Sequence, residues 1–325
     1  MTSIAARGVV SGDHPQHVGA ARSYALREAD LVLLLGGRLN WALAYGRSPR
    51  FSASARFIQI DRDPLELGRN RDVDVAIEAD LLQALLALCV AARPQAHHQG
   101  WLEQLRTRDR AGRARLTEGL TSDRVPIHPL RLCAEVRRVL PPEAVLIADG
   151  GDILSFARQG LDVYQPGGWL DAGTYGMIGH GLPMALGAKV AWPDHPVVVV
   201  AGDGAFGFHA MEMETAVRNK LPVVVVISNN GRWAIEHHTQ MNDFGRAVAT
   251  GLGQSDYAAL ARSLGADGYR IERPEELGPA LEAALHAPRP AVLDVITDPE
   301  LPSPDANRNL GSVPAEQAVI FRPEP

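Results

Sequence analysis

The sequence predicts an α/β protein made of two units, each built around a parallel sheet. Apolar strand-like runs alternate along the chain with segments of helical periodicity, which is typical of parallel sheets. The length of 325 residues and the hydrophobic content of 46% suffice for two domains with buried cores. A polar stretch rich in Arg, Gln and His, at about 94–125, separates the two series of strands and is expected to be a linker.

The first unit is expected to span 1–93. A helical segment ends near Asp30, and the apolar runs 31–36 and 56–61 predict two strands. A further helix is expected from 80 to about 92. Helices that alternate with strands in this way indicate βαβ units and a parallel sheet.

The second unit is expected to span 126–300, with helices between its strands. Four runs rich in branched apolar residues predict strands, at 144–149, 197–202, 222–228 and 291–296. The tail at 301–325 is rich in Pro, Asn and Asp and is expected to form loop.

Composition argues against several classes of function. The formal net charge is −6 with acids and bases interspersed, so no footprint for nucleic acid or an anionic membrane is present. The densest basic run, 106–115, is interpreted as a solvated linker face rather than a phosphate-binding site. Cys89 and Cys133 have no metal-binding spacing, and no disulfide framework is expected. No apolar run approaches the ~18 residues of a membrane span and no signal-peptide core is visible, so a cytoplasmic protein is expected.

Two neighbouring strands carry the strongest functional signal. The segment VVVVAGDGAF, 197–206, ends one strand in a Gly-Asp-Gly turn, and LPVVVVISNNGRW, 221–233, ends the next in an Asn-Asn loop. The 24 residues between Gly204 and Asn229 are enough for one helix and its connections. The two turns are therefore expected side by side at the carboxyl edge of the sheet.

These residue types suit a divalent metal and a diphosphate. Gly202 and Gly204 allow the backbone to approach a phosphate closely, while Asp203 supplies one carboxylate. Mg²⁺ takes about six oxygen ligands, usually with only one or two carboxylates. Each motif alone is more typical of an ordinary turn or loop. Together, each after a β-branched run, they favour a metal–diphosphate site.

The arrangement resembles the signature of thiamine-diphosphate-dependent enzymes. This resemblance implies Mg²⁺ and thiamine diphosphate as cofactors, with the side chains of Asp203 and Asn230 and the main-chain carbonyl of Arg232 as metal ligands. It also implies that Ala205 and Phe206 lie against the diphosphate. Many relatives have Gly where this chain has Arg232, a tolerable departure because only a carbonyl is needed.

Two further segments are similar to the same family. In GTYGMIGHGLPMALGAK, 173–189, the resemblance makes Ile178 the apolar wedge that holds the cofactor bent, and the carbonyl of Gly176 the acceptor for its 4′-amino group. The rest of that segment has the helical spacing of core residues. In VLIADGGDI, 145–153, a strand leads into a helix N-terminus, which attracts anions, so Gly151 and Asp152 are candidates for the far side of the diphosphate. An acid beside an anion is unusual.

The first unit resembles the central domain of the branch that contains 2-hydroxyacyl-CoA lyases and oxalyl-CoA decarboxylases. The segments are GDHPQHVGAARSYALREADLVLLLGGRLNW and RFIQIDRDPLELGRN. The implied fold is a truncated Rossmann-like central domain followed by a diphosphate-type domain. Arg38 and Asp61 would then lie near a nucleotide or CoA; alternatively, Arg38 pairs with an acid and Asp61 caps a strand end.

The resemblance implies a carbon–carbon lyase that converts a 2-hydroxyacyl-CoA into formyl-CoA and an aldehyde or ketone. The residues after the metal loop, 233–238, would face the substrate, with Trp233 and His237 as the main candidates. His237 and His238 either assist proton transfer or lie on a helix surface. Alternatives are oxalyl-CoA decarboxylation, acetolactate-synthase-like carboligation of 2-keto acids, and a non-catalytic cofactor-binding fragment.

The same resemblance implies a partner. Full-length members of the family carry a preceding pyrimidine-binding domain with a catalytic glutamate, and nothing before Gly8 supplies it. A homo-oligomer, or a hetero-oligomer with a chain that carries the pyrimidine-binding domain, is therefore expected.

Overall fold

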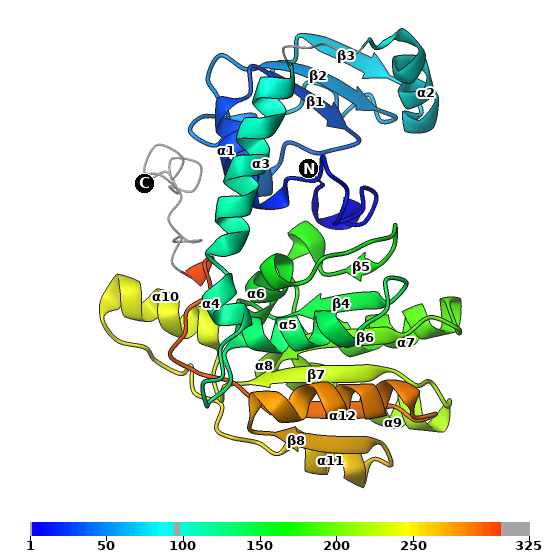
Figure 1. Cartoon of the computed structure of the whole chain (residues 1–325), viewed down its shortest axis with the longest axis vertical. Coiled ribbons are helices and arrows are strands. Elements are labelled where there is room, and N and C mark those ends of the chain that lie inside the picture. Colours follow the sequence, from blue (N-terminus) through cyan, green and yellow to red (C-terminus); the bar gives the residue numbers. More distant parts are fainter. Residues whose placement is uncertain (1, 94–97, 307–325) are drawn as a thin grey trace, which may run out of the picture. The chain divides into compact units, whose positions relative to one another are not determined.

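The computed structural model describes residues 2–93 and 98–306, which form two compact units (Figure 1). One unit comprises His14–Arg115, and the other comprises Thr2–Asp13 together with the chain from Leu116 onward. Each contains one parallel sheet with helices packed on it. The predicted α/β class with two parallel-sheet units is confirmed. Of the expected tail, 301–306 lies in loop and turn, and the remainder is outside the described residues.

The first unit has three parallel strands in the order β1-β2-β3. Its elements are η2 (Gly19–Ala21), α1 (Arg22–Glu28), β1 (Leu31–Leu35), η3 (Trp41–Gly46), β2 (Arg56–Asp61), β3 (Val75–Glu78), α2 (Leu81–Ala91) and α3 (His98–Ala114). Asp80 starts α2 as its N-cap, because its side chain accepts the N–H groups of Leu82 and Gln83. The strand β3 is only four residues long and has no long apolar run, so the sequence pattern does not reveal it.

Helix α3 occupies much of the stretch expected to be a linker and packs within the first unit. Trp101 stacks on Tyr24 with ring centroids 6.0 Å apart. The carboxylate of Asp109 accepts the Ala20 N–H at 2.8 Å and pairs with Arg113 at 3.0 Å. The basic run at 106–115 therefore lies, except for its last residue, on helix α3, which Trp101 and the buried Asp109 hold within the first unit.

The second unit has six parallel strands in the order β5-β4-β6-β7-β9-β8. Its strands are β4 (Val145–Asp149), β5 (Trp169–Leu170), β6 (Val197–Gly202), β7 (Val224–Asn229), β8 (Asp267–Ile271) and β9 (Ala291–Ile296). Its helices are η1 (Ile4–Ala6), α4 (Thr117–Leu120), α5 (Pro129–Val139), α6 (Asp152–Gly160), η4 (Gly173–Tyr175), α7 (Gly181–Ala191), α8 (Asp203–His209), α9 (Glu212–Arg218), α10 (Ala234–Phe244), α11 (Tyr257–Ser263) and α12 (Pro274–His286).

Alternation along the central strands builds a core on each face of this sheet. Val198 and Val200 belong to one buried cluster, which α5, α6 and α12 cover. Val197 and Val199 belong to the other, which α7, α9 and α11 cover. Successive side chains of a strand point to opposite faces, so a run of valines fills both layers.

The N-terminal segment packs with the second unit. The Arg7 guanidinium donates to the carbonyls of Arg158 at 3.0 Å and Leu161 at 2.8 Å, and it lies 4.2 Å from the centre of the Trp169 ring. Residues Thr2–Asp13 therefore belong to the second unit, although the first unit follows them in the sequence.

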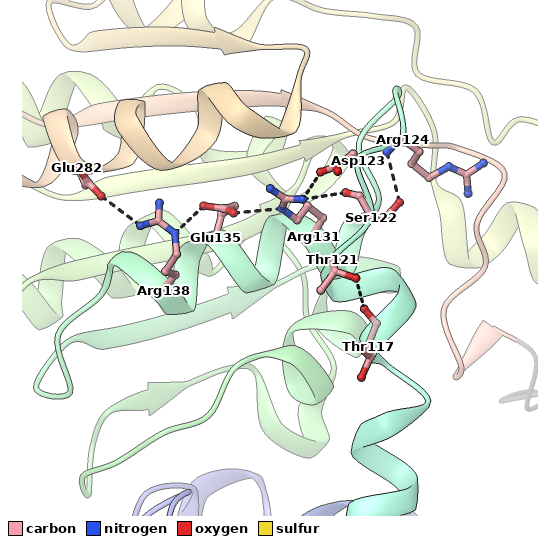
Figure 2. Close-up of polar contacts among 9 residues, drawn as sticks. All are labelled: Thr117, Thr121, Ser122, Asp123, Arg124, Arg131, Glu135, Arg138 and Glu282. Atoms are coloured by element: carbon pink, nitrogen blue, oxygen red, sulfur yellow. Dashed lines mark hydrogen bonds and ion pairs between the residues drawn. The ribbon is translucent and has the colours of Figure 1, made fainter.

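Figure 2 shows a ladder of charged side chains along the outside of α5. Glu135 accepts from Arg131 and from Arg138, and Arg138 reaches Glu282 of α12 at 3.5 Å. Arg131 also pairs with Asp123 at 2.6 Å. Of these pairs, the one that joins α5 to α12, Arg138–Glu282, is exposed at both side chains, and such pairs contribute about 0.2–1 kcal/mol.

The strand order sets the position of the site. In the parallel register, Gly202 of β6 lies opposite Ser228 of β7, and Asp149 of β4 lies opposite Ala201 of β6. The carboxyl ends of three adjacent strands therefore meet at one edge, as the spacing of the two motifs predicts. The connection from β6 to β7 contains two short helices, α8 and α9, where one was expected. Among the described residues, no helix combines the length and apolar composition needed to cross a bilayer.

Candidate cofactor and metal site

A pocket of about 280 Å³ opens at the carboxyl ends of β4, β6 and β7. Segments far apart in the sequence meet in it: the loop before α7 and the first turns of α6, α8 and α10. The lining residues that the sequence analysis singled out are Gly151, Asp152, Gly176, Ile178, Gly202, Asp203, Gly204, Ala205, Asn230, Arg232 and Trp233. The other lining residues are Gly150, Ile153, Ser228, Ala234, Ile235 and Glu236.

Asp203 is the first residue of α8 and is only 2% exposed. One carboxylate oxygen accepts the Gly204 N–H at 2.9 Å, and the other accepts the Gly231 N–H at 2.8 Å. Within the described residues no basic side chain forms an ion pair with it. Burial raises the pKa of Asp203 to about 6, although the backbone hydrogen bonds oppose this shift. A desolvated carboxylate without a counter-charge is suited to a bound cation.

The Gly231 contact joins the two motifs at the strand ends. It places the carboxylate of Asp203 within hydrogen-bond distance of the residue that follows Asn230. Asn230 lines the same pocket, and its side-chain oxygen accepts the Arg232 N–H at 3.3 Å. The Arg232 guanidinium pairs with Glu300 at 3.2 Å, so its charge is engaged by the C-terminal part of the chain.

The neighbouring Asn229 has a different role. It is fully buried, and its side-chain amide donates to Asp294 at 2.8 Å and to the Ser255 carbonyl at 2.9 Å. These bonds tie the end of β7 to β9 and to the loop before α11. Asn229 thus supports the loop that presents Asn230 to the pocket.

Gly151 and Asp152 lie at the start of α6. The Asp152 carboxylate accepts the Ser303 N–H at 3.1 Å, and its other oxygen lies 4.0 Å from Nε2 of His238. Burial is the main reason why the pKa of Asp152 is raised. The unusual acid at the diphosphate end is therefore engaged by the C-terminal segment and faces a buried histidine of α10.

The loop before α7 forms another wall of the pocket. Gly176 has a left-handed backbone with φ of +71°, and Ile178 lines the pocket two residues later. The Gly179 and Gly181 N–H groups donate to the carboxylate of Asp149 at the end of β4. Asp149 thus holds the loop to the strand that also leads into Gly150 and Gly151.

Two glycines make room for side chains from the β7–α10 connection and the first turn of α10. A Cβ atom at Gly204 would lie 2.4 Å from the Trp233 ring, and one at Gly151 would lie 2.4 Å from Cγ2 of Ile235. The backbone at the starts of α8 and α6 is therefore covered closely by Trp233 and Ile235. Any larger residue at either glycine would displace these two pocket walls.

Four predicted positions are not brought to this pocket. Phe206 is buried and packs edge-on against Tyr257, with ring centroids 5.5 Å apart. His237 does not line the pocket, and its Nδ1 lies 3.0 Å from the Thr250 hydroxyl; desolvation, with help from nearby Arg232, lowers its pKa.

The other two positions, Arg38 and Asp61, belong to the first unit. Arg38 lies 3.4 Å from Glu66, and Asp61 accepts the Asp63 N–H at 3.0 Å. Arg38 thus pairs with an acid, and Asp61 accepts a backbone N–H at the end of its strand, which are the alternative roles that the sequence allows for them.

The charge of the pocket favours a cation. Asp152, Asp203 and Glu236 line it, and Arg232, the one basic residue among the lining side chains, pairs with Glu300. The described part of the chain contains no cluster of three His, Cys, Asp or Glu side chains able to hold a metal. A metal here would rely on one carboxylate with amide and carbonyl oxygens, the hard ligand set that suits Mg²⁺. The residues present therefore fit a Mg²⁺–diphosphate group.

Sequence reasoning missed the role of Asp149 at the site. Asp149 stands inside the quoted strand segment, directly before two glycines, and its position at a strand end was the available signal. Ile235 and Glu236 were not missed: they belong to the segment 233–238 that is expected to face the substrate, and both line the pocket.

Comparison with known proteins agrees with this geometry. Residues 149–295 match the model of the thiamine pyrophosphate enzyme C-terminal TPP binding domain, and residues 1–88 match the thiamine pyrophosphate enzyme central domain. The first match includes every residue that lines the pocket.

Three relatives illustrate the range of similar proteins. A probable acetolactate synthase of Mycobacterium bovis is 40% identical over 300 residues, which are 92% of this chain and 54% of the relative. The oxalyl-CoA decarboxylase of Escherichia coli is 33% identical, over 90% of this chain and 53% of its own length. The 2-hydroxyacyl-CoA lyase 2 of Bos taurus is 35% identical, over 83% and 43% respectively.

The chain thus spans about half the length of the curated relatives that it matches. Both domain models come from one group of enzymes, and they cover the two sheets that the structure contains. The chain therefore carries the central and the C-terminal TPP-binding domains of the thiamine pyrophosphate enzyme family.

Proposed function

We propose that the pocket binds thiamine diphosphate through Mg²⁺ and that the chain forms part of an enzyme that breaks or makes a carbon–carbon bond. The observation that carries this proposal is the convergence of Asp203, Asn230, Gly151 and Ile178 on one pocket, from separate segments of the sheet edge. A match to the family's TPP-binding domain supports the cofactor.

The metal would be held by the side chains of Asp203 and Asn230 and by the carbonyl of Arg232. The ion would supply the positive charge that the buried Asp203 carboxylate lacks and would offset the negative charge of a diphosphate. Gly202, Gly204 and Ala205 are proposed to face the phosphates, because small residues allow the backbone to come close.

The thiamine part is assigned to the pocket wall that the loop before α7 forms. When bound, the cofactor supplies the carbanion chemistry, and the protein supplies orientation and electrostatics. Ile178 would contact the thiamine part, and the Gly176 carbonyl would accept a hydrogen bond from the amino group of the cofactor. Trp233, Ile235 and Glu236 line the pocket from the β7–α10 connection and α10 and are the proposed substrate-facing side.

The lead reaction is cleavage of a 2-hydroxyacyl-CoA between C1 and C2, with formyl-CoA and an aldehyde or ketone as products. Similarity to proteins named 2-hydroxyacyl-CoA lyase and oxalyl-CoA decarboxylase supports a thioester substrate. Decarboxylation of oxalyl-CoA is the closely related alternative, since carbon dioxide would then be the leaving group.

A second candidate is acetolactate-type carboligation of 2-keto acids. The identity of 40% to a probable acetolactate synthase exceeds the 33–35% to the CoA-dependent relatives, which favours this candidate. Both reactions would use the same metal and cofactor residues. They would differ in what occupies the space beside Trp233.

The working enzyme is proposed to be an assembly. Glu236 is the one glutamate among the residues that line the pocket, and it projects from α10 rather than from a pyrimidine-binding domain. That domain would come from an additional polypeptide segment, within a homo-oligomer or a hetero-oligomer. Without it, the chain would act as a cofactor-binding fragment.

Cofactor binding can be tested first. Isothermal titration calorimetry should show thiamine diphosphate binding that requires Mg²⁺, and Asp203→Ala should abolish it. Asp267→Asn is the matched control, because Asp267 begins β8 and pairs with Arg289 away from the pocket. Metal-independent binding, or unchanged affinity of the Asp203→Ala protein, would refute the site.

The reaction can be tested separately with a pyrimidine-binding domain supplied from a relative. Formyl-CoA production from a 2-hydroxyacyl-CoA would support the lead, whereas acetolactate from pyruvate would establish the second candidate. Tight cofactor binding without turnover of 2-hydroxyacyl-CoA, oxalyl-CoA or pyruvate would support the fragment reading and exclude these three activities for this chain.

A further inference from the structure

We infer that Asp149 is a positioning residue that fixes the shape of the pocket loop carrying Gly176 and Ile178, and thereby the fit of the thiamine part of the cofactor. This inference rests on the proposed function for its ligand. We call the hydrogen bonds from Gly179 and Gly181 to the Asp149 carboxylate the clamp. The clamp consists only of contacts among residues of the second unit.

The carboxylate of Asp149 is almost fully buried, at 1% exposure, and bonds to the loop at two points. One oxygen accepts the Gly179 N–H at 3.1 Å, and the other accepts the Gly181 N–H at 2.7 Å. An ionised carboxylate that accepts two backbone N–H groups forms stronger bonds than a neutral acceptor does. Both oxygens are thus used within three residues of the loop, immediately after Ile178.

A histidine of the loop adds a third contact. His180 is buried, and its Nδ1 lies 3.2 Å from Asp149 and 3.1 Å from the Met177 carbonyl. An Nδ1–H tautomer can donate to both acceptors. Asp149 and the loop backbone are therefore linked through a side chain as well as directly.

The loop is shaped to receive this carboxylate. A Cβ atom at Gly181 would lie 2.9 Å from Cβ of Asp149, so only glycine allows the approach. Gly179 has a φ of +87°, and its carbonyl lies 2.6 Å from Nδ1 of His209 in α8. The loop is thus fixed from β4 and from α8, while Gly176 and Ile178 line the pocket.

Asp149 does not line the pocket but connects two of its walls. It directly precedes Gly150 and Gly151, which line the pocket and of which Gly151 is a candidate for the diphosphate, and it holds the loop proposed to meet the thiamine part. Removal of one hydrogen bond of Asp149 should therefore loosen the loop that carries Gly176 and Ile178. The metal–diphosphate end, built by Asp203 and Asn230, should stay in place.

The substitution Asp149→Asn tests this division. Asparagine keeps the size, but its amide N–H₂ would face a backbone N–H, so one of the two bonds is lost. In titration calorimetry with Mg²⁺, the variant should bind inorganic pyrophosphate within about twofold of the unmutated protein. Its affinity for thiamine diphosphate should fall at least about tenfold, the scale of one lost charge-assisted hydrogen bond.

Asp267→Asn is the control for the same chemical change at the other end of the sheet and should alter neither affinity. An Asp149→Asn protein that keeps the unmutated ratio of the two affinities would overturn the inference. An equal loss of affinity for pyrophosphate and for thiamine diphosphate in a folded variant would overturn it too, since Asp149 would then support the whole pocket and not the loop alone.

Hydrogen exchange of the unmutated protein gives a second test that needs no ligand and no variant. The amides of Gly179 and Gly181, followed by NMR, should exchange at least about a hundredfold more slowly than in an unfolded chain. Fast exchange of both amides would show that the clamp does not form in solution. Should neither pyrophosphate nor thiamine diphosphate bind the unmutated protein, the proposed function would fail, whereas the exchange result would still decide the clamp.

Discussion

At the scale of single residues, the site depends on a carboxylate that is costly to bury. Asp203 is 2% exposed, and its carboxylate accepts hydrogen bonds from the backbone N–H groups of Gly204 and Gly231. A pKa raised to about 6 means that the folded state holds the proton more tightly than the unfolded state, whose pKa is near 3.8. In the metal-free protein, stability should therefore fall as pH rises from about 4 to about 6 and stay reduced above that range.

Asp203→Asn should accordingly stabilise the metal-free protein while it abolishes cofactor binding. A shift of about two pKa units corresponds to about 3 kcal/mol at pH 8, an upper figure for the gain. Urea unfolding at pH 4 and pH 8 measures it: the variant and the unmutated protein should differ little at pH 4 and most at pH 8. If the variant were less stable than the unmutated protein at pH 8, the backbone hydrogen bonds to the Asp203 carboxylate would outweigh the cost of burying its charge.

The two cysteines give a second prediction at this scale. Cys133 is fully buried in α5, and burial raises the pKa of its thiol to about 12, whereas Cys89 is exposed. Only thiolates react readily, so a thiol-exchange reagent at pH 8 should modify one cysteine quickly in the native protein and both in urea. Mass spectrometry should place the native label on Cys89. Rapid native labelling of Cys133 would mean that α5 opens frequently.

At the scale of elements, the sequence pattern is informative where a strand is apolar over its whole length. The runs of Val and Ile in β6, β7 and β9 predict buried central strands, because side chains on both faces meet a core. The strands β3, β5 and β8 lie at sheet edges and are short or carry polar residues such as Asp267 and Arg270, so periodicity does not reveal them.

The same reasoning explains which parts of the site could be predicted. Asp203 and Asn230 follow adjacent parallel strands, so the topology rule brings them together. The contact of Asp149 with Gly181 joins residues 32 positions apart through a loop of irregular backbone. No local pattern encodes such a contact, and the closure of the pocket by Ile235 depends in the same way on how α10 packs.

Helix α2 allows a test of one local element. Asp80 accepts the N–H groups of Leu82 at 3.0 Å and Gln83 at 3.2 Å, and no residue of α2 is buried. The cap should therefore matter to this helix, and Asp80→Ala should lower the stability of the first unit by about 1 kcal/mol. Denaturant unfolding followed by circular dichroism measures the loss. Asp80→Asn keeps an acceptor and should behave like the unmutated protein; an equal loss in both variants would point to charge rather than capping.

At the scale of the whole molecule, the described chain has separate cores in its two units. Val18, Ala25 and Leu105 belong to a small cluster in the first unit, while the two large clusters lie on the faces of the six-stranded sheet. The proposed cofactor pocket belongs entirely to the second unit. A ligand that binds only the folded form of one unit stabilises that unit by mass action.

Calorimetric unfolding should therefore show two transitions, of which thiamine diphosphate with Mg²⁺ raises only one. At a free ligand concentration of about 100 times Kd the gain is about 2.7 kcal/mol, which for a unit of this size corresponds to roughly 5–10 °C. Asp80→Ala identifies the other transition, because it should lower that one alone. Magnesium without the cofactor should leave both nearly unchanged. A single transition that moves as a whole with ligand would mean that the two units unfold cooperatively, and the pocket would then be coupled to the smaller sheet.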